Sequence, residues 1–117
     1  MKTILVVDDE SDMRDALQAI LEAEGYRVVT ASNGRQALDL LEKGDATDLV
    51  LLDVMMPLMT GYQLLDCMQE KAELRKLAVV MMSAVEPPTR ISDRWLSFLM
   101  KPFSYDDLLK AVSVAIP

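Results

Sequence analysis

The most informative absence from this sequence is histidine, of which there is none. Without it, the chain can hold no histidine–aspartate catalytic dyad, no histidine metal ligand and no phosphohistidine donor. The four glycines are widely spaced, at positions 25, 34, 44 and 61. They cannot form a glycine-rich nucleotide loop or a Walker loop, so nucleotide-dependent enzymes and bound nucleotide cofactors are disfavoured.

Cysteine and long hydrophobic runs are also scarce. The single cysteine, Cys67, cannot form an internal disulfide and suits a reducing cytoplasm. The longest apolar runs, at 49–52 and 77–82, are far shorter than the roughly 20 residues that a membrane helix needs. The apolar run at the N-terminus is too short for a secretory signal. We therefore expect a cytoplasmic protein that does not enter a membrane.

Basic residues are in the minority. Lysine and arginine number 12 against 19 acidic residues, which gives a net charge of −7. The sequence contains no basic stripe of the kind that follows a nucleic-acid backbone. We expect no direct nucleic-acid binding, and we expect the negative charge to favour cations or basic partners.

Short apolar runs alternate with segments in which apolar residues recur at helical spacing. The pattern predicts strands at 3–7, 26–30, 48–53, 77–82 and 97–100, and helices around 13–21, 37–41, 62–72 and 105–116. Gly25 is typical of a helix C-cap and Ser104 of an N-cap. Because the strands are apolar throughout, we predict a parallel sheet covered by helices on both faces, a doubly wound α/β domain over residues 1–117.

Polar side chains follow four of the predicted strands. Asp8 and Asp9 end the first strand, Asp53 ends the third, Ser83 ends the fourth and Lys101 follows the fifth. The carboxyl ends of parallel strands share one edge, where ligands of such sheets bind. We therefore expect these side chains to lie together.

The chemistry of this cluster indicates phosphoryl transfer assisted by Mg²⁺. Carboxylates that are packed together repel one another unless a cation is present, and Mg²⁺ suits oxygen ligands of this kind. We predict Asp9 and Asp53 as direct ligands, Asp8 as a ligand acting largely through water, and the Met55 carbonyl as a further oxygen. Asp53 is the best candidate nucleophile, since a carboxylate can form an acyl phosphate. Lys101 and the Ser83 hydroxyl can donate to the transferred group.

The chain resembles the receiver domain of two-component response regulators from about Ile4 to its C-terminus. The likeness rests on Asp8-Asp9-Glu10, Asp53 with Met56-Pro57 and Gly61, Ser83-Ala84, Phe98, and Lys101-Pro102-Phe103. It implies a flavodoxin-like five-stranded parallel sheet of order 2-1-3-4-5 with flanking helices. It also implies a cis peptide before Pro102.

The resemblance implies a phosphoacceptor signalling switch that catalyses only its own phosphorylation and dephosphorylation. Asp53 would take a phosphoryl group from a histidine kinase or a histidine phosphotransfer protein, and Lys101 would contact the phosphoryl oxygens. Ser83 and Phe98 would move as a coupled switch. The protein would be a monomer or would dimerise on phosphorylation. The sequence does not name its kinase or its downstream target.

The segment between the fourth and fifth strands departs from the family pattern. It is several residues short and contains Glu86-Pro87-Pro88, and a proline pair cannot lie inside a regular helix. We predict that the fourth helix is shortened or missing, which puts in doubt the signalling surface that receivers commonly form there. Trp95 is expected to fill part of the gap as core. Met55 and Val85 cannot orient an attacking water, so we also predict slow self-dephosphorylation.

Three alternatives remain open at this stage. A haloacid dehalogenase-type phosphatase also uses an aspartate at a strand end, but it needs a second aspartate two residues on, where this chain has Met55. A flavin-binding relative of the same fold would need a phosphate-binding loop after the first strand, which is lacking. An interaction module that has lost phosphorylation is disfavoured because all five site residues are present.

Overall fold

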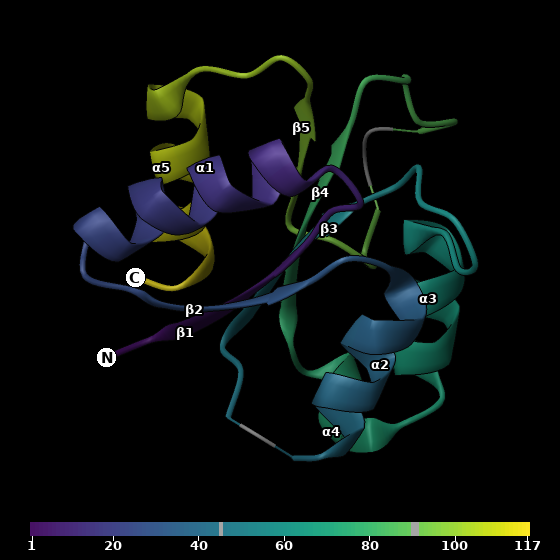
Figure 1. Cartoon of the computed structure of the whole chain (residues 1–117). Helices are drawn as coiled ribbons and strands as arrows, with labels where there is room; N and C mark the ends of the chain where they lie inside the picture. The colour runs from purple at the N-terminus through teal and green to yellow at the C-terminus, as the bar shows by residue number, and fades with distance from the viewer. Residues whose placement is uncertain (45, 90–91) are drawn as a thin grey trace.

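The five apolar runs form one parallel sheet in the computed structural model, which describes residues 1–44, 46–89 and 92–117 (Figure 1). The strands are β1 (Thr3–Val7), β2 (Arg27–Ala31), β3 (Leu49–Asp53), β4 (Ala78–Ser83) and β5 (Ser97–Met100). The helices are α1 (Ser11–Ala23), α2 (Gly34–Glu42), α3 (Gly61–Gln69), α4 (Ala72–Arg75) and α5 (Tyr105–Ala115). The strand order is β2-β1-β3-β4-β5, and every pair is parallel, as predicted.

The helices cover both faces of the sheet. Figure 1 shows α1 and α5 on one face and α2, α3 and α4 on the other. Alternate residues of each central strand point to opposite faces. In β3, Val50 and Leu52 belong to the core beneath α2 and α3, whereas Leu49 and Leu51 belong to the core beneath α1 and α5. This two-sided burial explains why the central strands are apolar at consecutive positions.

The predicted helix ends are confirmed where capping residues define them. Gly25 has a φ of +94° directly after the α1 C-cap, a conformation that glycine adopts without strain. The Ser104 hydroxyl accepts a hydrogen bond from the Asp107 N–H at 3.0 Å and caps α5. The Lys101-Pro102 peptide is cis, as the resemblance implied.

One helix was not predicted. The sequence pattern continued the third helix to Ala72, but α3 ends at Gln69 and Ala72 begins the four-residue α4. The break falls at Lys71, whose backbone is extended with φ −120° and ψ 123°. Apolar spacing alone does not reveal such a break, because Leu74 of α4 joins the same core as Met68 of α3.

The connection from β4 to β5 carries the main departure from the family pattern. None of the described residues between Ser83 and Ser97 lies in a helix, which agrees with the prediction that the fourth helix is shortened or missing. Part of the weak helical signal at 89–95 falls on residues 90 and 91, outside the described residues. Trp95 is 8 % exposed and belongs to the core on the α2–α3 face, as expected.

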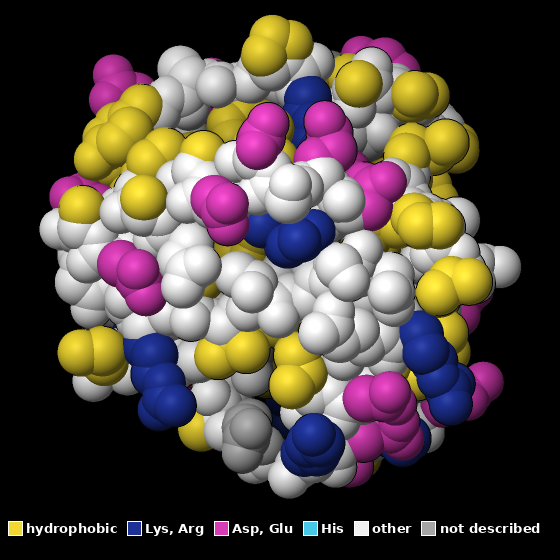
Figure 2. All heavy atoms as spheres, viewed as in Figure 1, with side chains coloured by type: hydrophobic (Ala, Val, Ile, Leu, Met, Phe, Trp, Pro, Cys, Tyr) yellow, Lys and Arg dark blue, Asp and Glu magenta, His cyan; other side chains and the backbone are white. Residues whose placement is uncertain are grey.

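The exposed surface is mixed in character. Figure 2 shows acidic, basic and hydrophobic side chains interspersed over the visible face, and the described residues form no continuous basic patch on it. Within the described ranges, no helix combines the length and the apolar character needed to cross a bilayer.

Candidate functional site

The site lies at the carboxyl end of the sheet, where four strands deliver the predicted side chains. Asp8 and Asp9 directly follow β1, Asp53 is the last residue of β3, Ser83 is the last of β4, and Lys101 directly follows β5. The Val54 N–H donates to the Met82 carbonyl at 2.9 Å and the Lys101 N–H to the Ser83 carbonyl at 2.8 Å. These backbone bonds continue the sheet pairing to its edge and hold the strand ends side by side.

Lys101 joins the carboxylates. Its Nζ donates to Oδ2 of Asp8 at 2.8 Å and lies 3.4 Å from Oδ1 of Asp53. Its side chain is only 12 % exposed, and that of Asp8 is fully buried. Burial alone would lower the pKa of Lys101, but the hydrogen bond to Asp8 and the charge of Asp53 outweigh it and the pKa is raised. Lys101 therefore remains an ammonium ion at neutral pH.

Asp53 is poised to ionise close to neutral pH. Its pKa is raised from 3.8 to about 6, first by burial and then by the charge of Asp8, while Lys101 opposes the shift. The residue is 3 % exposed. It opens into a pocket of about 220 Å³, here called the Asp53 pocket, which is lined by Asp9, Glu10, Asp53, Met55, Ala84 and Lys101.

Three carboxylates fit a divalent cation. Asp8, Asp9 and Asp53 each offer an oxygen, and these oxygens all lie within 4.8 Å of one another. Hard cations such as Mg²⁺ take carboxylate oxygens, and one or two carboxylates are typical for this ion. Burial is the first cause of the raised pKa of Asp53, and the charge of Asp8 adds to it. The three carboxylates outnumber the single Lys101 ammonium beside them. Both the ligand type and the local charge therefore suit Mg²⁺. Met55 lines the same pocket with its side chain 59 % exposed.

The two predicted switch residues lie outside the lining of the Asp53 pocket. Ser83 is 1 % exposed, and its Oγ accepts a hydrogen bond from the Val85 N–H at 3.0 Å. Phe98 is 9 % exposed and packs edge-on against Trp95, with ring centroids 5.6 Å apart. The structure thus brings Asp8, Asp9, Asp53 and Lys101 together at the sheet edge. Ser83 ends β4, the strand between those of Asp53 and Lys101, and Phe98 lies in β5 and packs in the core.

Sequence reasoning missed Arg14 and the role of Gly61. The Arg14 Nη1 donates to the Asp8 carbonyl at 2.8 Å and fixes the backbone at the acidic pair. At Gly61 a Cβ would lie 2.4 Å from the Asp53 carbonyl oxygen, so α3 can begin this close to Asp53 only with glycine. Gly61 matched the family motif, but the sequence offers no physical reason for a glycine at this position. In the sequence, Arg14 carries no signal beyond its place near the start of a predicted helix.

A parallel 2-1-3-4-5 sheet with an acidic pocket at its carboxyl edge defines a class of doubly wound α/β domains. The family described as response regulator receiver domain matches residues 4–113. The chain therefore belongs to the receiver domains of two-component response regulators, signalling domains that act as switches. This membership favours the receiver interpretation over the phosphatase and flavin-binding alternatives.

Relatives and solved structures agree with this assignment. The two-component response regulator ORR11 of Oryza sativa subsp. indica is 38 % identical over 97 % of this chain and 80 % of its own length. The chemotaxis protein CheY4 of Vibrio cholerae has a TM-score of 0.89 and 28 % identity, covering 99 % of both chains. The response regulator TrrA of Thermotoga maritima, solved in complex with Mg²⁺ and BeF, has a TM-score of 0.87 and 30 % identity, covering 99 % of this chain and 100 % of that one.

Proposed function

We propose that the chain accepts a phosphoryl group on Asp53 from a histidine kinase or a histidine phosphotransfer protein. One observation carries the proposal: Lys101 Nζ lies 2.8 Å from Asp8 and 3.4 Å from Asp53, and Lys101 and Asp53 both line the Asp53 pocket. This arrangement places a positive charge beside a carboxylate that is only 3 % exposed but lines the Asp53 pocket. Phosphoryl transfer depends mainly on such positioning and on neutralisation of charge.

The reaction consists of a nucleophilic displacement at phosphorus. With a pKa of about 6, most of the Asp53 population is ionised at neutral pH, and one carboxylate oxygen attacks the phosphorus of a phosphoimidazole. The new P–O bond forms as the P–N bond breaks, and the imidazole nitrogen leaves with the electron pair. Lys101 balances charge on the transferred oxygens. Dephosphorylation is a separate step: water attacks the phosphorus, the P–O bond to Asp53 breaks, and inorganic phosphate and the free Asp53 carboxylate are released.

Asp8, Asp9 and Asp53 would hold Mg²⁺, with the Met55 carbonyl as a further ligand. When bound, the ion would supply positive charge to the phosphoryl oxygens. Both Asp8 carboxylate oxygens already accept protein hydrogen bonds, from the Glu10 N–H at 2.9 Å and from Lys101. This occupancy supports a role for Asp8 through water, while Asp9 is exposed and available as a direct ligand.

The phosphoryl group would then change the contacts of Ser83 and Phe98. The Ser83 Oγ is held only by the Val85 N–H among the bonds of the described residues, so its hydroxyl can turn to a phosphoryl oxygen. Movement of Ser83 would free space that Phe98 takes up. The outcome is a switch that works in the cytoplasm as a monomer or a phosphorylation-dependent dimer.

Binding of a phosphoryl mimic tests the proposal directly. Beryllofluoride added with Mg²⁺ is expected to give a bound ¹⁹F NMR signal in the wild-type protein and none in Asp53→Asn or without Mg²⁺. Absence of a bound signal from the folded wild-type protein would show that the domain signals by contact alone, which is the remaining alternative.

A further inference from the structure

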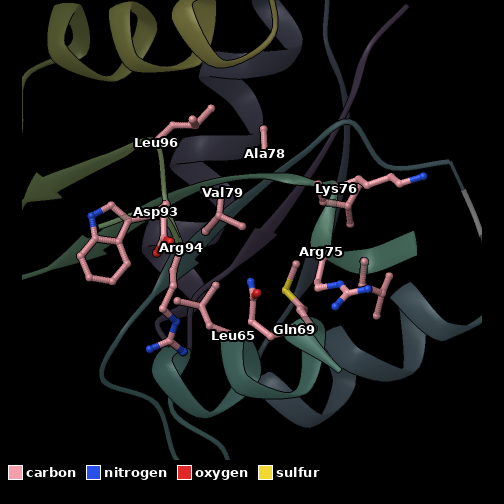
Figure 3. Close-up of a pocket in the computed structure, with 13 residues that line it drawn as sticks. Leu65, Gln69, Arg75, Lys76, Ala78, Val79, Asp93, Arg94 and Leu96 are labelled. Atoms are coloured by element: carbon pink, nitrogen blue, oxygen red, sulfur yellow. The ribbon is translucent and has the colours of Figure 1, made fainter. Parts of the chain in front are cut away.

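A second pocket, of about 280 Å³, lies at the opposite end of β4 from Ser83. Its walls come from α3, from α4 and the residues after it, from the start of β4, and from residues 93–96 before β5. Figure 3 shows Asp93 and Arg94 on one side of the hollow, Arg75 and Lys76 on the other, and Leu65 and Gln69 of α3 along the base. We call it the α3 pocket.

The α3 pocket combines an apolar interior with a cationic edge. Leu65, Met68, Val79 and Trp95 are all buried and line it. At the edge, Arg75 and Lys76 are exposed, and neither makes an ion pair within the part of the chain that the structure describes. Asp93 is also exposed but lies on the opposite side of the pocket, so the positive charge is concentrated on the side of Arg75 and Lys76. An apolar interior beside available cations suits an apolar group that carries carboxylates nearby.

The size of the pocket indicates what kind of ligand enters it. Pockets for drug-sized ligands generally span about 300–1,000 Å³, so a volume of about 280 Å³ lies at the lower limit. It is large enough for one bulky side chain, and single apolar or aromatic anchors in pockets dominate many protein interfaces. A partner protein that inserts one side chain fits this volume better than a free nucleotide or lipid.

The wall formed by residues 93–96 touches the predicted switch. Trp95 packs between Phe98 at 5.6 Å and Tyr62 of α3 at 6.1 Å between ring centroids. The neighbouring Arg94 Nη2 donates to Asp66 Oδ1 at 2.6 Å and to the Tyr62 carbonyl at 3.2 Å. These contacts tie the segment before β5 to α3, in a connection where no described residue is helical. A displacement of Phe98 would therefore move a wall of the α3 pocket.

We propose that the α3 pocket docks an acidic segment of a partner protein by taking up one apolar side chain, and that the state of Asp53 alters its affinity. The docking stands on the pocket itself, whereas the coupling to Asp53 rests on the proposed function. The carboxylates of the partner segment would face Arg75 and Lys76.

Short peptides can test the docking without knowledge of the partner. The probes are blocked pentapeptides with paired glutamates on both sides of a central phenylalanine, with alanine in its place, or with lysines in place of the glutamates. Trp95 is the only tryptophan, so its emission reports binding, and amide NMR shifts of α3 and β4 locate it. The acidic phenylalanine peptide is expected to give a saturable response, and the alanine and lysine peptides much weaker ones.

Substitutions at exposed positions test the contribution of charge to peptide binding without disturbing the core of the fold. The double variant Arg75→Gln and Lys76→Gln is expected to weaken binding roughly three- to tenfold, since each exposed charge pair contributes modestly. Arg35→Gln on α2 removes an exposed cation that does not line the pocket and is expected to leave binding unchanged. The docking would be overturned by no saturable response up to about 5 mM peptide, or by equal binding of the acidic and lysine peptides.

A separate experiment tests whether the state of Asp53 alters binding at the α3 pocket. Beryllofluoride with Mg²⁺ is expected to change the dissociation constant of the acidic peptide at least twofold. An unchanged constant in protein whose Asp53 has bound beryllofluoride would overturn the coupling and leave the proposed function standing. Failure of beryllofluoride to bind, with peptide binding intact, would instead reject the phosphoacceptor function.

Discussion

Asp8 and Asp53 are both buried carboxylates, yet their environments differ. Asp8 receives the Glu10 N–H and the Lys101 ammonium, and the Arg14 guanidinium holds its carbonyl. Among the contacts of the described residues, Asp53 has only the longer 3.4 Å contact to Lys101, and it lines the Asp53 pocket. Donors around a carboxylate stabilise its charge, whereas burial without enough donors raises its pKa. The less satisfied residue is therefore the one left free to react.

The raised pKa of Asp53 has a consequence for stability. Its pKa is about 6 in the folded protein against 3.8 for the ordinary group, so the folded state binds the proton more tightly than the unfolded state does. The protonated form stabilises the fold below about pH 4, and this contribution is lost as the pH rises through about 6. Asp53→Asn is expected to raise the free energy of unfolding by roughly 1–3 kcal/mol at pH 7 and by much less at pH 4.

Urea unfolding without divalent cations measures this effect. The exposed Asp15 on α1 gives a matched control, because Asp15→Asn removes the same charge from a position with no burial. If Asp53→Asn raised the free energy of unfolding equally at pH 4 and pH 7, the result would contradict a raised pKa of Asp53.

Two apolar side chains are expected to lie close to a phosphoryl group on Asp53: Met55 lines the Asp53 pocket, and Val85 lies next to the strand end at Ser83. Met55 and Val85 are each 59 % exposed, and neither can hydrogen-bond a water for attack on phosphorus. Introducing an amide should help to place that water, so Met55→Asn is expected to speed loss of phosphate roughly tenfold. Release of inorganic phosphate from the purified phosphorylated protein is the measurement. Met55→Leu keeps the apolar character and is expected to leave the rate near that of the wild type.

At the scale of elements, the first turn of α3 sets how the chain leaves the site. The Thr60 hydroxyl accepts from the Gln63 N–H at 3.2 Å, and the Gln63 side chain accepts from the Thr60 N–H at 2.9 Å, which forms a capping box. Thr60→Ala is expected to lower the free energy of unfolding by about 1 kcal/mol. Thr60→Asp keeps an acceptor and is expected to retain most of the stability. Chemical denaturation compares them, and equal losses would show that the cap contributes nothing.

The elements were predictable where local patterns decide them. Runs of consecutive apolar residues predicted β1, β3 and β4. The capping residue Ser104 predicted where α5 begins. The proline pair at 87–88 likewise indicated a shortened or missing helix, and none of the described residues between β4 and β5 is helical. The break between α3 and α4 was missed because both helices bury residues in the same core, so the apolar spacing continues across it.

At the scale of the molecule, the site depends on segments far apart in the chain. Lys101 reaches Asp8 across 93 positions, and the strand order brings them together. The predicted side chains could be gathered because each follows a recognisable strand. The α3 pocket could not be predicted, since its walls meet only after Trp95 packs against Tyr62 and Arg94 bonds to Asp66.

Metal binding should register in the stability of the whole domain. A ligand that binds only the folded state raises the free energy of unfolding, by about 2.7 kcal/mol at a concentration one hundred times its dissociation constant. Mg²⁺ is expected to raise the melting temperature of the wild-type protein and to have a much smaller effect on Asp9→Asn and Asp53→Asn. Differential scanning calorimetry at matched ionic strength separates the effect of Mg²⁺ binding at the site from the general screening of charges by salt. An equal shift in all three proteins would argue against the carboxylate site.

The central claim is that Asp53 accepts a phosphoryl group, and intact-protein mass after incubation with acetyl phosphate and Mg²⁺ tests it most directly. The account predicts the mass of one added phosphoryl group, which is absent from Asp53→Asn and from samples lacking Mg²⁺. An unchanged mass of the folded wild-type protein, or the same addition to Asp53→Asn, would contradict it.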